Sequence, residues 1–167
     1  MENDRAAAPL PLGDRFAEGP LPPHHAGCFG CGHSNPASPR IAFERRGDTV
    51  RGTFTLDGRH QGAPGVAHGG IVAAALDEAS GSVLMPLRLP AVTVKLDVDF
   101  KSPALLQREL VVTSVLTARS GRKLYIDAVL TDGDTVVATA RAIFLEVSPE
   151  HFVRNGATPG ELSSVGA

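Results

Sequence analysis

The sequence predicts an α+β domain in which an antiparallel sheet packs against one long helix. Apolar residues recur at helical spacing in a single stretch, residues 65–86. The other regular segments alternate apolar and polar residues or are rich in β-branched residues, and short glycine turns join them. Two strands, one helix and four further strands are typical of a helix that covers one face of an antiparallel sheet. With 167 residues, 43% of them apolar, the chain can build one such core.

The helix has clear expected boundaries. It should begin after the turn formers Gly62, Pro64 and Gly65 and end at Met85, because Pro86 cannot donate the next backbone hydrogen bond. One apolar stripe, expected to pack against the sheet, consists of Val72, Leu76, Ala79 and Val83.

A second face of the helix carries almost no side-chain bulk. It consists of Gly70, Ala73, Ala74, Asp77 and Gly81. A solvated face would normally carry Lys, Arg and Glu. We therefore interpret Asp77 as a catalytic carboxylate and the neighbouring Glu78 as an exposed one.

The start of the helix, at Gly69 and Gly70, presents backbone N–H groups without side chains. Such groups can bind an oxyanion or a polarised carbonyl oxygen. Asp77 could attack that carbonyl or activate water, but it lies roughly 10 Å beyond Gly70 along a helix. The two groups can therefore serve one carbonyl only if two chains supply them.

Six strands are expected around this helix, with hairpin turns at Gly47-Asp48, Ser120-Gly121 and Asp132-Gly133-Asp134. The strands are expected at residues 40–46, 49–56, 91–101, 109–118, 123–131 and 135–147. In the strand at 91–101, the residues expected on one face are Val94, Leu96, Val98 and Phe100, and those on the other are Thr93, Lys95, Asp97 and Asp99.

The expected single domain covers residues 27–154. Residues 1–26 contain five prolines and no regular periodicity, so we expect a flexible arm that either hangs free or packs on the domain. Residues 155–167 are small and polar and are expected to form a flexible tail.

A loop rich in Gly, Pro and Ser contains Cys28 and Cys31 at metal-ligand spacing, and His24, His25 and His33 flank them. Two cysteines and two histidines could hold zinc. The usual second pair of ligands at zinc-finger distance is missing, however. We therefore favour a structural loop without metal, in which both thiols pack as small apolar groups.

Charge and hydropathy exclude several classes of function. A net charge of -2 and the lack of a long basic run argue against a nucleic-acid surface. The chain has no apolar run of about eighteen residues, so no membrane span is expected. Acidic residues stand first and no continuous apolar segment follows, which argues against a secretory signal and for a cytoplasmic protein with reduced thiols.

Three segments together resemble the hotdog-fold thioesterase superfamily, and within it the acyl-CoA thioesterases of the phenylacetic-acid-degradation type. The segments are CFGCGHSNP, HQGAPGVAHGGIVAAALDEASG and TVKLDVDFKSPALL. The central motif is His-Gly-Gly with an aspartate nine positions after the histidine. It is met by His68, Gly69, Gly70 and Asp77, and a strand that ends in Ser-Pro-Ala follows.

The resemblance implies a sheet curled around a central helix, a homodimer or homotetramer with a continuous sheet, and composite active sites at the dimer interface. It implies that the Gly69 N–H polarises the thioester carbonyl and that Asp77 of the other subunit is nucleophile or general base. Thr93 matches a position that often helps to place water. His68 either orders the loop at the helix start or takes part in acid–base chemistry.

The remaining candidates are a catalytic group that assists the carbonyl, for which Gln61 is named, and substrate-binding residues, which include His60. In similar proteins a polar side chain six residues before His-Gly-Gly assists the carbonyl; here that position is Gly62, so Gln61 or His60 is the candidate. A basic group that either holds the phosphates of coenzyme A or forms a solvated hairpin tip consists of Arg119, Arg122 and Lys123.

The main hypothesis is an acyl-CoA thioesterase that hydrolyses a thioester to free acid and coenzyme A without a metal or redox cofactor. One alternative is a non-catalytic acyl-CoA-binding protein on the same fold, since fold alone does not establish chemistry. Another is a zinc-stabilised interaction module built on the Cys28 loop. A Gly-x-Ser-x-Gly elbow and the DxxxxH pattern of hotdog hydratases are both missing from the motif region.

Overall fold

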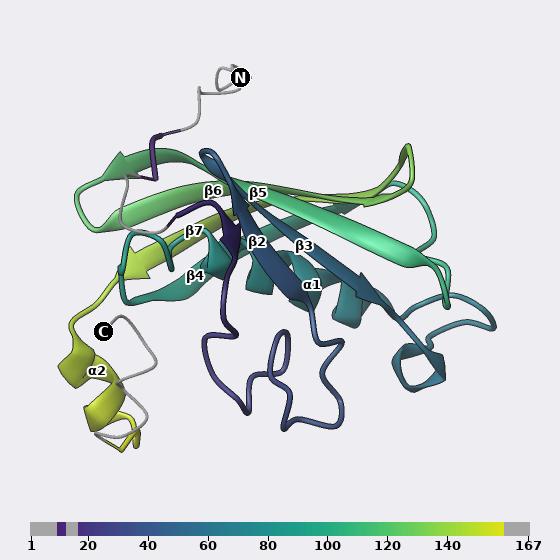
Figure 1. Cartoon of the computed structure of the whole chain (residues 1–167), viewed down its shortest axis with the longest axis horizontal. Coiled ribbons are helices and arrows are strands. Elements are labelled where there is room, and N and C mark those ends of the chain that lie inside the picture. Colours follow the sequence, from purple (N-terminus) through teal and green to yellow (C-terminus); the bar gives the residue numbers. More distant parts are fainter. Residues whose placement is uncertain (1–9, 13–16, 159–167) are drawn as a thin grey trace.

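Seven strands of the described residues form one antiparallel sheet with the order β1-β2-β3-β5-β6-β7-β4 (Figure 1). The computed structural model describes residues 10–12 and 17–158. The strands are β1 (Gly19–Pro20), β2 (Ala42–Arg46), β3 (Thr49–Thr55), β4 (Ala91–Phe100), β5 (Glu109–Ser120), β6 (Lys123–Asp132) and β7 (Thr135–Glu146). The helices are α1 (Gly69–Ser82), α2 (Pro149–Arg154) and the 3-10 turn η1 (Gly58–His60). Strand β1 and helix α2 were not expected, because two and six residues are too few to show a period.

The sheet arches over α1, which packs against strands β3 to β7 (Figure 1). The expected apolar stripe of α1 is buried: Leu76, Ala79 and Val83 are fully enclosed and Val72 is 3% exposed. Burial of a Leu or Val side chain typically contributes about 1.5–3 kcal/mol, so this stripe anchors the helix to the sheet. The α+β class with one central helix is confirmed.

Two-residue turns that begin with glycine close three hairpins. Gly47, Gly121 and Gly133 have φ values of 58°, 58° and 55°, in the left-handed region that glycine adopts without steric cost. They join β2 to β3, β5 to β6 and β6 to β7. The expected hairpin positions are confirmed. They could be predicted because this turn geometry favours glycine.

Helix α1 ends at Ser82, three residues before the expected end at Met85. Beyond it, the N–H groups of Leu84 and Met85 donate to the carbonyls of Gly81 and Ser82, at 3.0 and 3.2 Å. These bonds span three residues instead of four, which is the tighter winding common at helix ends. No helix in the described residues is both long and apolar enough to cross a membrane.

Strand β4 is one edge of the sheet, and its pairing with β7 shifts between Thr93 and Lys95, which leaves Val94 as a bulge. Thr93 pairs with the buried Phe144, and paired residues share a face of the sheet. Thr93 therefore points toward α1. The expectation that Thr93 shares a face with Lys95 was wrong. It assumed strict alternation along the strand, and the extra residue at Val94 breaks that alternation. Val94, expected on the same face as Leu96 and Val98, is 53% exposed.

Part of the expected N-terminal arm contacts the sheet. Leu12 is fully buried, the Leu10 N–H donates to the carbonyl of Leu116 over 2.8 Å, and β1 pairs with β2. Residues 1–9 and 13–16 of the arm, and residues 159–167 of the expected tail, lie outside the described residues.

Candidate active site on helix α1

Asp77, in the middle of α1, is hydrogen-bonded to strand β4. The Thr93 hydroxyl donates to Oδ1 of Asp77 over 2.9 Å. Asp77 lies on the small-residue face of the helix and is half-buried, and the bulge at Val94 turns Thr93 toward it. The structure thus brings together the carboxylate and the hydroxyl that were expected in one site.

Burial raises the pKa of Asp77 above its ordinary value, because loss of solvent disfavours the charged carboxylate. The hydrogen bond from Thr93 opposes this rise by stabilising the charged form, and the nearby Cys28 adds to it. A carboxylate with a raised pKa is a better proton acceptor than an exposed aspartate. This environment suits removal of a proton from water.

His68 accepts hydrogen bonds from three of the backbone N–H groups at the start of α1. Nδ1 of His68 accepts the N–H of Gly70 over 2.9 Å, and its carbonyl accepts those of Ile71 and Val72 at 3.0 and 3.3 Å. In the part of the chain that the structure describes, the Gly69 N–H has no acceptor. One donor of the first turn therefore remains for a ligand.

The two glycines at the helix start serve different purposes. A Cβ on Gly70 would lie 3.0 Å from the capping Nδ1 of His68, so a side chain there would disturb the cap. A Cβ on Gly69 would meet the ring of Phe100 at 3.5 Å, which is ordinary contact. Packing therefore accounts for Gly70, whereas the space beside Gly69 would admit a Cβ.

The Gly69 N–H and the Asp77 carboxylate do not meet within one chain. They are eight residues apart on α1, about 12 Å along the axis. One thioester carbonyl could not contact both groups of the same helix.

His60 and Gln61 hold the loop that leads into α1. His60 is buried; its Nδ1 accepts the N–H of Asp57 and its Nε2 lies beside the carbonyl of Ala37, both at 3.2 Å. The exposed Gln61 accepts the N–H of Gly65 through Oε1 over 3.1 Å. Nδ1 of His60 is thus engaged within this loop and Nε2 by a distant segment at Ala37, so Gln61 is the better placed to reach a ligand.

Arg119, Arg122 and Lys123 lie at the hairpin between β5 and β6, apart from Asp77. Arg119 forms an ion pair with Glu146 of β7 at 2.5 Å, and Arg122 bonds to the Glu146 carbonyl at 3.5 Å. The strand register places Arg119 in the same row as Thr93 of β4, three strands away or roughly 14 Å across the sheet. Only a ligand long enough to span this distance could contact both the basic group and the site at Thr93.

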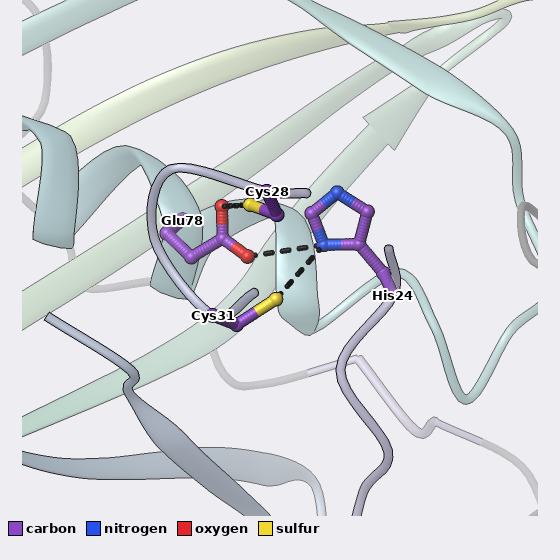
Figure 2. A group of neighbouring side chains, drawn as sticks. All are labelled: His24, Cys28, Cys31 and Glu78. Atoms are coloured by element: carbon purple, nitrogen blue, oxygen red, sulfur yellow. Dashed lines mark hydrogen bonds and ion pairs between the residues drawn. The ribbon is translucent and has the colours of Figure 1, made fainter. Parts of the chain in front are cut away.

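Glu78, next to Asp77, is not the exposed carboxylate that was expected. Only 13% of its side chain is exposed, and its oxygens lie 3.2 Å from Sγ of Cys28 and 3.0 Å from Nδ1 of His24 (Figure 2). The prediction was wrong because a loop fifty residues away in the chain covers this turn of the helix. The loop lies so close to the helix that a Cβ on Gly30 would lie 2.4 Å from Cγ of Glu78.

Residues 64–143, from the loop before α1 into β7, match a family model described as Thioesterase superfamily. The acyl-coenzyme A thioesterase THEM4 of Mus musculus is 34% identical over 92 residues, which is 54% of this chain and 40% of that protein. The chain thus matches less than half the length of this relative.

Two solved structures have the same architecture. The thioesterase superfamily protein RHA08564 matches with a TM-score of 0.69 and 28% identity, over 72% of this chain and 61% of that one. A hypothetical thioesterase from Streptococcus pneumoniae, solved with coenzyme A, matches with a TM-score of 0.61 and 21% identity, over 65% and 89% of the two chains. The fold is therefore the hotdog fold of thioesterase-superfamily proteins, with α1 as the central helix.

Proposed function

We propose that this protein is an acyl-CoA thioesterase, of the phenylacetic-acid-degradation type, that hydrolyses an acyl-CoA thioester to the free acid and coenzyme A. The observation that carries the proposal is the half-buried Asp77, bonded to Thr93, on a helix whose first N–H, at Gly69, is free for a ligand. The similarity to an acyl-coenzyme A thioesterase supports the substrate class.

The Gly69 N–H is the group that polarises the thioester. It would donate to the carbonyl oxygen, and the positive end of the α1 dipole would stabilise the negative charge that develops there. His68 supports this role by capping Gly70 and so fixing the direction of the first turn. We assign His68 this ordering function because its Nδ1 is already engaged by the backbone.

Asp77 supplies the second half of the chemistry. Acting as a base, it takes a proton from water while the water oxygen bonds to the carbonyl carbon; acting as a nucleophile, it bonds to that carbon itself. In both cases the C–S bond breaks and the sulfur of coenzyme A takes up a proton. In the nucleophilic route, water then cleaves the anhydride between the acyl group and Asp77, which releases the free acid and restores the carboxylate. The Thr93 hydroxyl holds the carboxylate in one orientation through this step.

Two copies of the chain complete one site in this proposal. Strand β4 has ten residues, lies at the sheet edge and exposes Val94 and Phe100, and such an edge is a template for pairing. Phe100 lies against Gly69, whereas Thr93 at the other end of β4 holds Asp77. Antiparallel pairing of two β4 strands would therefore bring the start of one α1 opposite the Asp77 of the other.

Coenzyme A would extend from this site toward basic residues. Arg119 keeps 47% of its side chain exposed although it pairs with Glu146, and Lys123 is exposed beside it. We propose that Arg119, Arg122 and Lys123 contact the phosphates of coenzyme A, which needs charged donors of this kind. The coenzyme A bound by the Streptococcus pneumoniae thioesterase of the same fold supports this ligand class.

Thiol release from a panel of acyl-CoA substrates tests the proposal. Replacement Asp77→Asn keeps the shape of the side chain and removes its charge, so kcat should fall by about 10²–10⁴-fold. The matched control is Asp134→Asn, at an exposed turn between β6 and β7, and it should keep the wild-type rate.

Two outcomes would contradict the proposal. If the wild type binds acyl-CoA but releases no thiol from any substrate, the protein is a binder and not an enzyme. If Asp77→Asn releases thiol as fast as the wild type, the base or nucleophile lies elsewhere.

A further inference from the structure

Four potential metal ligands join the N-terminal loop to helix α1 (Figure 2). His24, Cys28 and Cys31 come from the loop and Glu78 from the helix; we call these residues the loop–helix group. One ligand atom from each residue lies within 4.8 Å of all the others. The proposed hydrolysis uses none of these side chains.

Three of the distances within the loop–helix group are close to those of a tetrahedral metal site. Nδ1 of His24 lies 3.0 Å from Oε1 of Glu78 and 3.4 Å from Sγ of Cys31, and Sγ of Cys28 lies 3.2 Å from Oε2 of Glu78. Ordinary zinc bond lengths at tetrahedral angles place neighbouring ligand atoms about 3.4–3.8 Å apart. Only small movements of these side chains would complete the tetrahedron.

The loop backbone is shaped to present both sulfurs. The Gly30 N–H donates to Sγ of Cys28 over 3.2 Å, and the Gly32 N–H donates to the Cys28 carbonyl over 3.1 Å. A Cβ on Gly32 would lie 2.4 Å from the carbonyl oxygen of Ala26, so this turn requires glycine. A backbone donor aimed at sulfur favours the thiolate, which is the form that binds metals.

One oxygen of the group lacks a hydrogen bond. Oε1 of Glu78 is buried, and among the described residues it accepts none; its contact with His24 is an ion pair outside hydrogen-bond geometry. A buried carboxylate oxygen in this state is costly. A bond to a metal ion would satisfy it.

The donor set selects the kind of metal and its role. Two thiolates, an imidazole and a carboxylate suit zinc, whereas magnesium and calcium prefer sites built from oxygen. Four protein donors fill a tetrahedral shell and leave no position for substrate, as in structural sites.

We propose that the loop–helix group binds one zinc ion, which fastens the N-terminal loop to the turn of α1 beside Asp77. Binding would displace the thiol protons of Cys28 and Cys31 and leave His24 neutral. The sequence favoured a metal-free loop because a second ligand pair was missing; in space, His24 and Glu78 supply it. The inference does not depend on thioesterase activity.

The metal content of the full chain tests this proposal. Protein purified under reducing conditions without chelator should hold about one zinc ion per chain, by elemental analysis and native mass spectrometry. After removal of the metal, Co²⁺ should give a thiolate-to-cobalt charge-transfer band and the visible bands of tetrahedral cobalt, and Zn²⁺ should abolish both. This measurement on the wild type does not require any variant to fold.

Variants then assign the ligands. Cys31→Ser and Glu78→Gln should each lower zinc affinity by more than about tenfold, since each removes a direct ligand. His33→Ala should retain wild-type affinity, because His33 is exposed in the same loop and lies outside the group. Circular dichroism of each variant separates loss of the site from loss of the fold.

Two results would overturn the proposal. The first is reduced wild-type protein with neither zinc nor a cobalt charge-transfer band. The second has two parts: the unreduced protein contains a disulfide between Cys28 and Cys31, and the same protein binds no metal after reduction. The two thiols would then be a redox pair. Neither result would alter thiol release, so the zinc site and the proposed hydrolysis fail or hold separately.

Discussion

At the scale of single residues, Thr93 reaches Asp77 only because strand β4 contains one extra residue. The bulge at Val94 turns the Thr93 hydroxyl toward α1, where it donates to the carboxylate over 2.9 Å. Bulges commonly re-aim a side chain next to an active site in this way. Burial and this hydrogen bond act on the pKa of Asp77 in opposite directions.

Removal of the Thr93 hydroxyl should change the pH dependence of hydrolysis. In Thr93→Val the charged carboxylate of Asp77 loses a donor, so its pKa rises further and the acid limb of kcat/KM moves to higher pH. We expect kcat to fall by about 10–100-fold, the effect of losing one hydrogen bond to a charged group. Thr93→Ser keeps the hydroxyl and should restore both the limb and most of the rate; an unshifted limb in Thr93→Val would contradict the role given to Thr93.

At the scale of elements, helix α1 is organised by its cap. His68 takes up the N–H of Gly70 and, through its carbonyl, two more N–H groups of the first turn. The Gly69 N–H is left, and it points out of the end at which the helix dipole is positive. The cap therefore determines which donor can meet a substrate.

Proline at position 69 should remove this donor while leaving the helix intact. Proline is favoured at the first helical position, and His68, with φ -65° and ψ 136°, has the extended backbone that proline requires before it. We expect Gly69→Pro to lower kcat by about 10²–10³-fold, as when one oxyanion donor is lost. The control Gly69→Ala retains the N–H and places a Cβ at ordinary contact distance from Phe100, so it should keep most activity.

The melting temperature makes this comparison interpretable. Gly69→Pro should melt close to the wild type, because no hydrogen bond within the described residues uses the Gly69 N–H. A Gly69→Pro protein that melts normally and hydrolyses at the wild-type rate would show that another group polarises the carbonyl.

At the scale of the whole molecule, the proposed site needs two chains. The Gly69 N–H and Asp77 are about 12 Å apart along α1. The two ends of the β4 edge lie beside them, Phe100 next to Gly69 and Thr93 bonded to Asp77. Two-fold pairing of the β4 edges would form two identical sites. Each would contain the Gly69 N–H of one chain and Asp77 of the other.

Mixed dimers should therefore recover activity from two inactive variants. In a heterodimer of Asp77→Asn with Gly69→Pro, one site has both groups intact and the other has neither. Random mixing in equal amounts, after denaturation and refolding together, should restore about one quarter of the wild-type rate in a two-fold dimer. Asp77→Asn mixed with the double variant Asp77→Asn/Gly69→Pro has no intact site and serves as control.

Continued inactivity of the first mixture would contradict a shared site. This outcome counts against the shared site only if light scattering shows that each mixture contains dimers or larger assemblies. A monomeric and active wild type would contradict it independently.

Local patterns were sufficient for much of the fold and for part of the candidate site. The hairpin turns at Gly47, Gly121 and Gly133 were predictable because their left-handed backbone conformation strongly favours glycine. The buried stripe of α1 was predictable because helical spacing alone puts those residues on one face. Asp77 stood out for the same reason, as a carboxylate on a face of small residues.

The features of the site that were not predicted depend on contacts between distant segments. The bulge in β4 follows from pairing with β7, and the burial of Glu78 follows from a loop fifty residues away. Sequence periodicity describes one element at a time and contains no information on such contacts.

The sequence by itself thus determined the α+β class and the position of α1, and it singled out Asp77 as the candidate carboxylate, because each depends on residues close together in the chain. Only the tertiary structure decided that Thr93 faces Asp77, that the cap spares the Gly69 N–H and that Glu78 joins His24, Cys28 and Cys31. These arrangements depend on contacts between segments that are distant in the chain. Burial and hydrogen bonding favour these contacts only when the whole chain is folded.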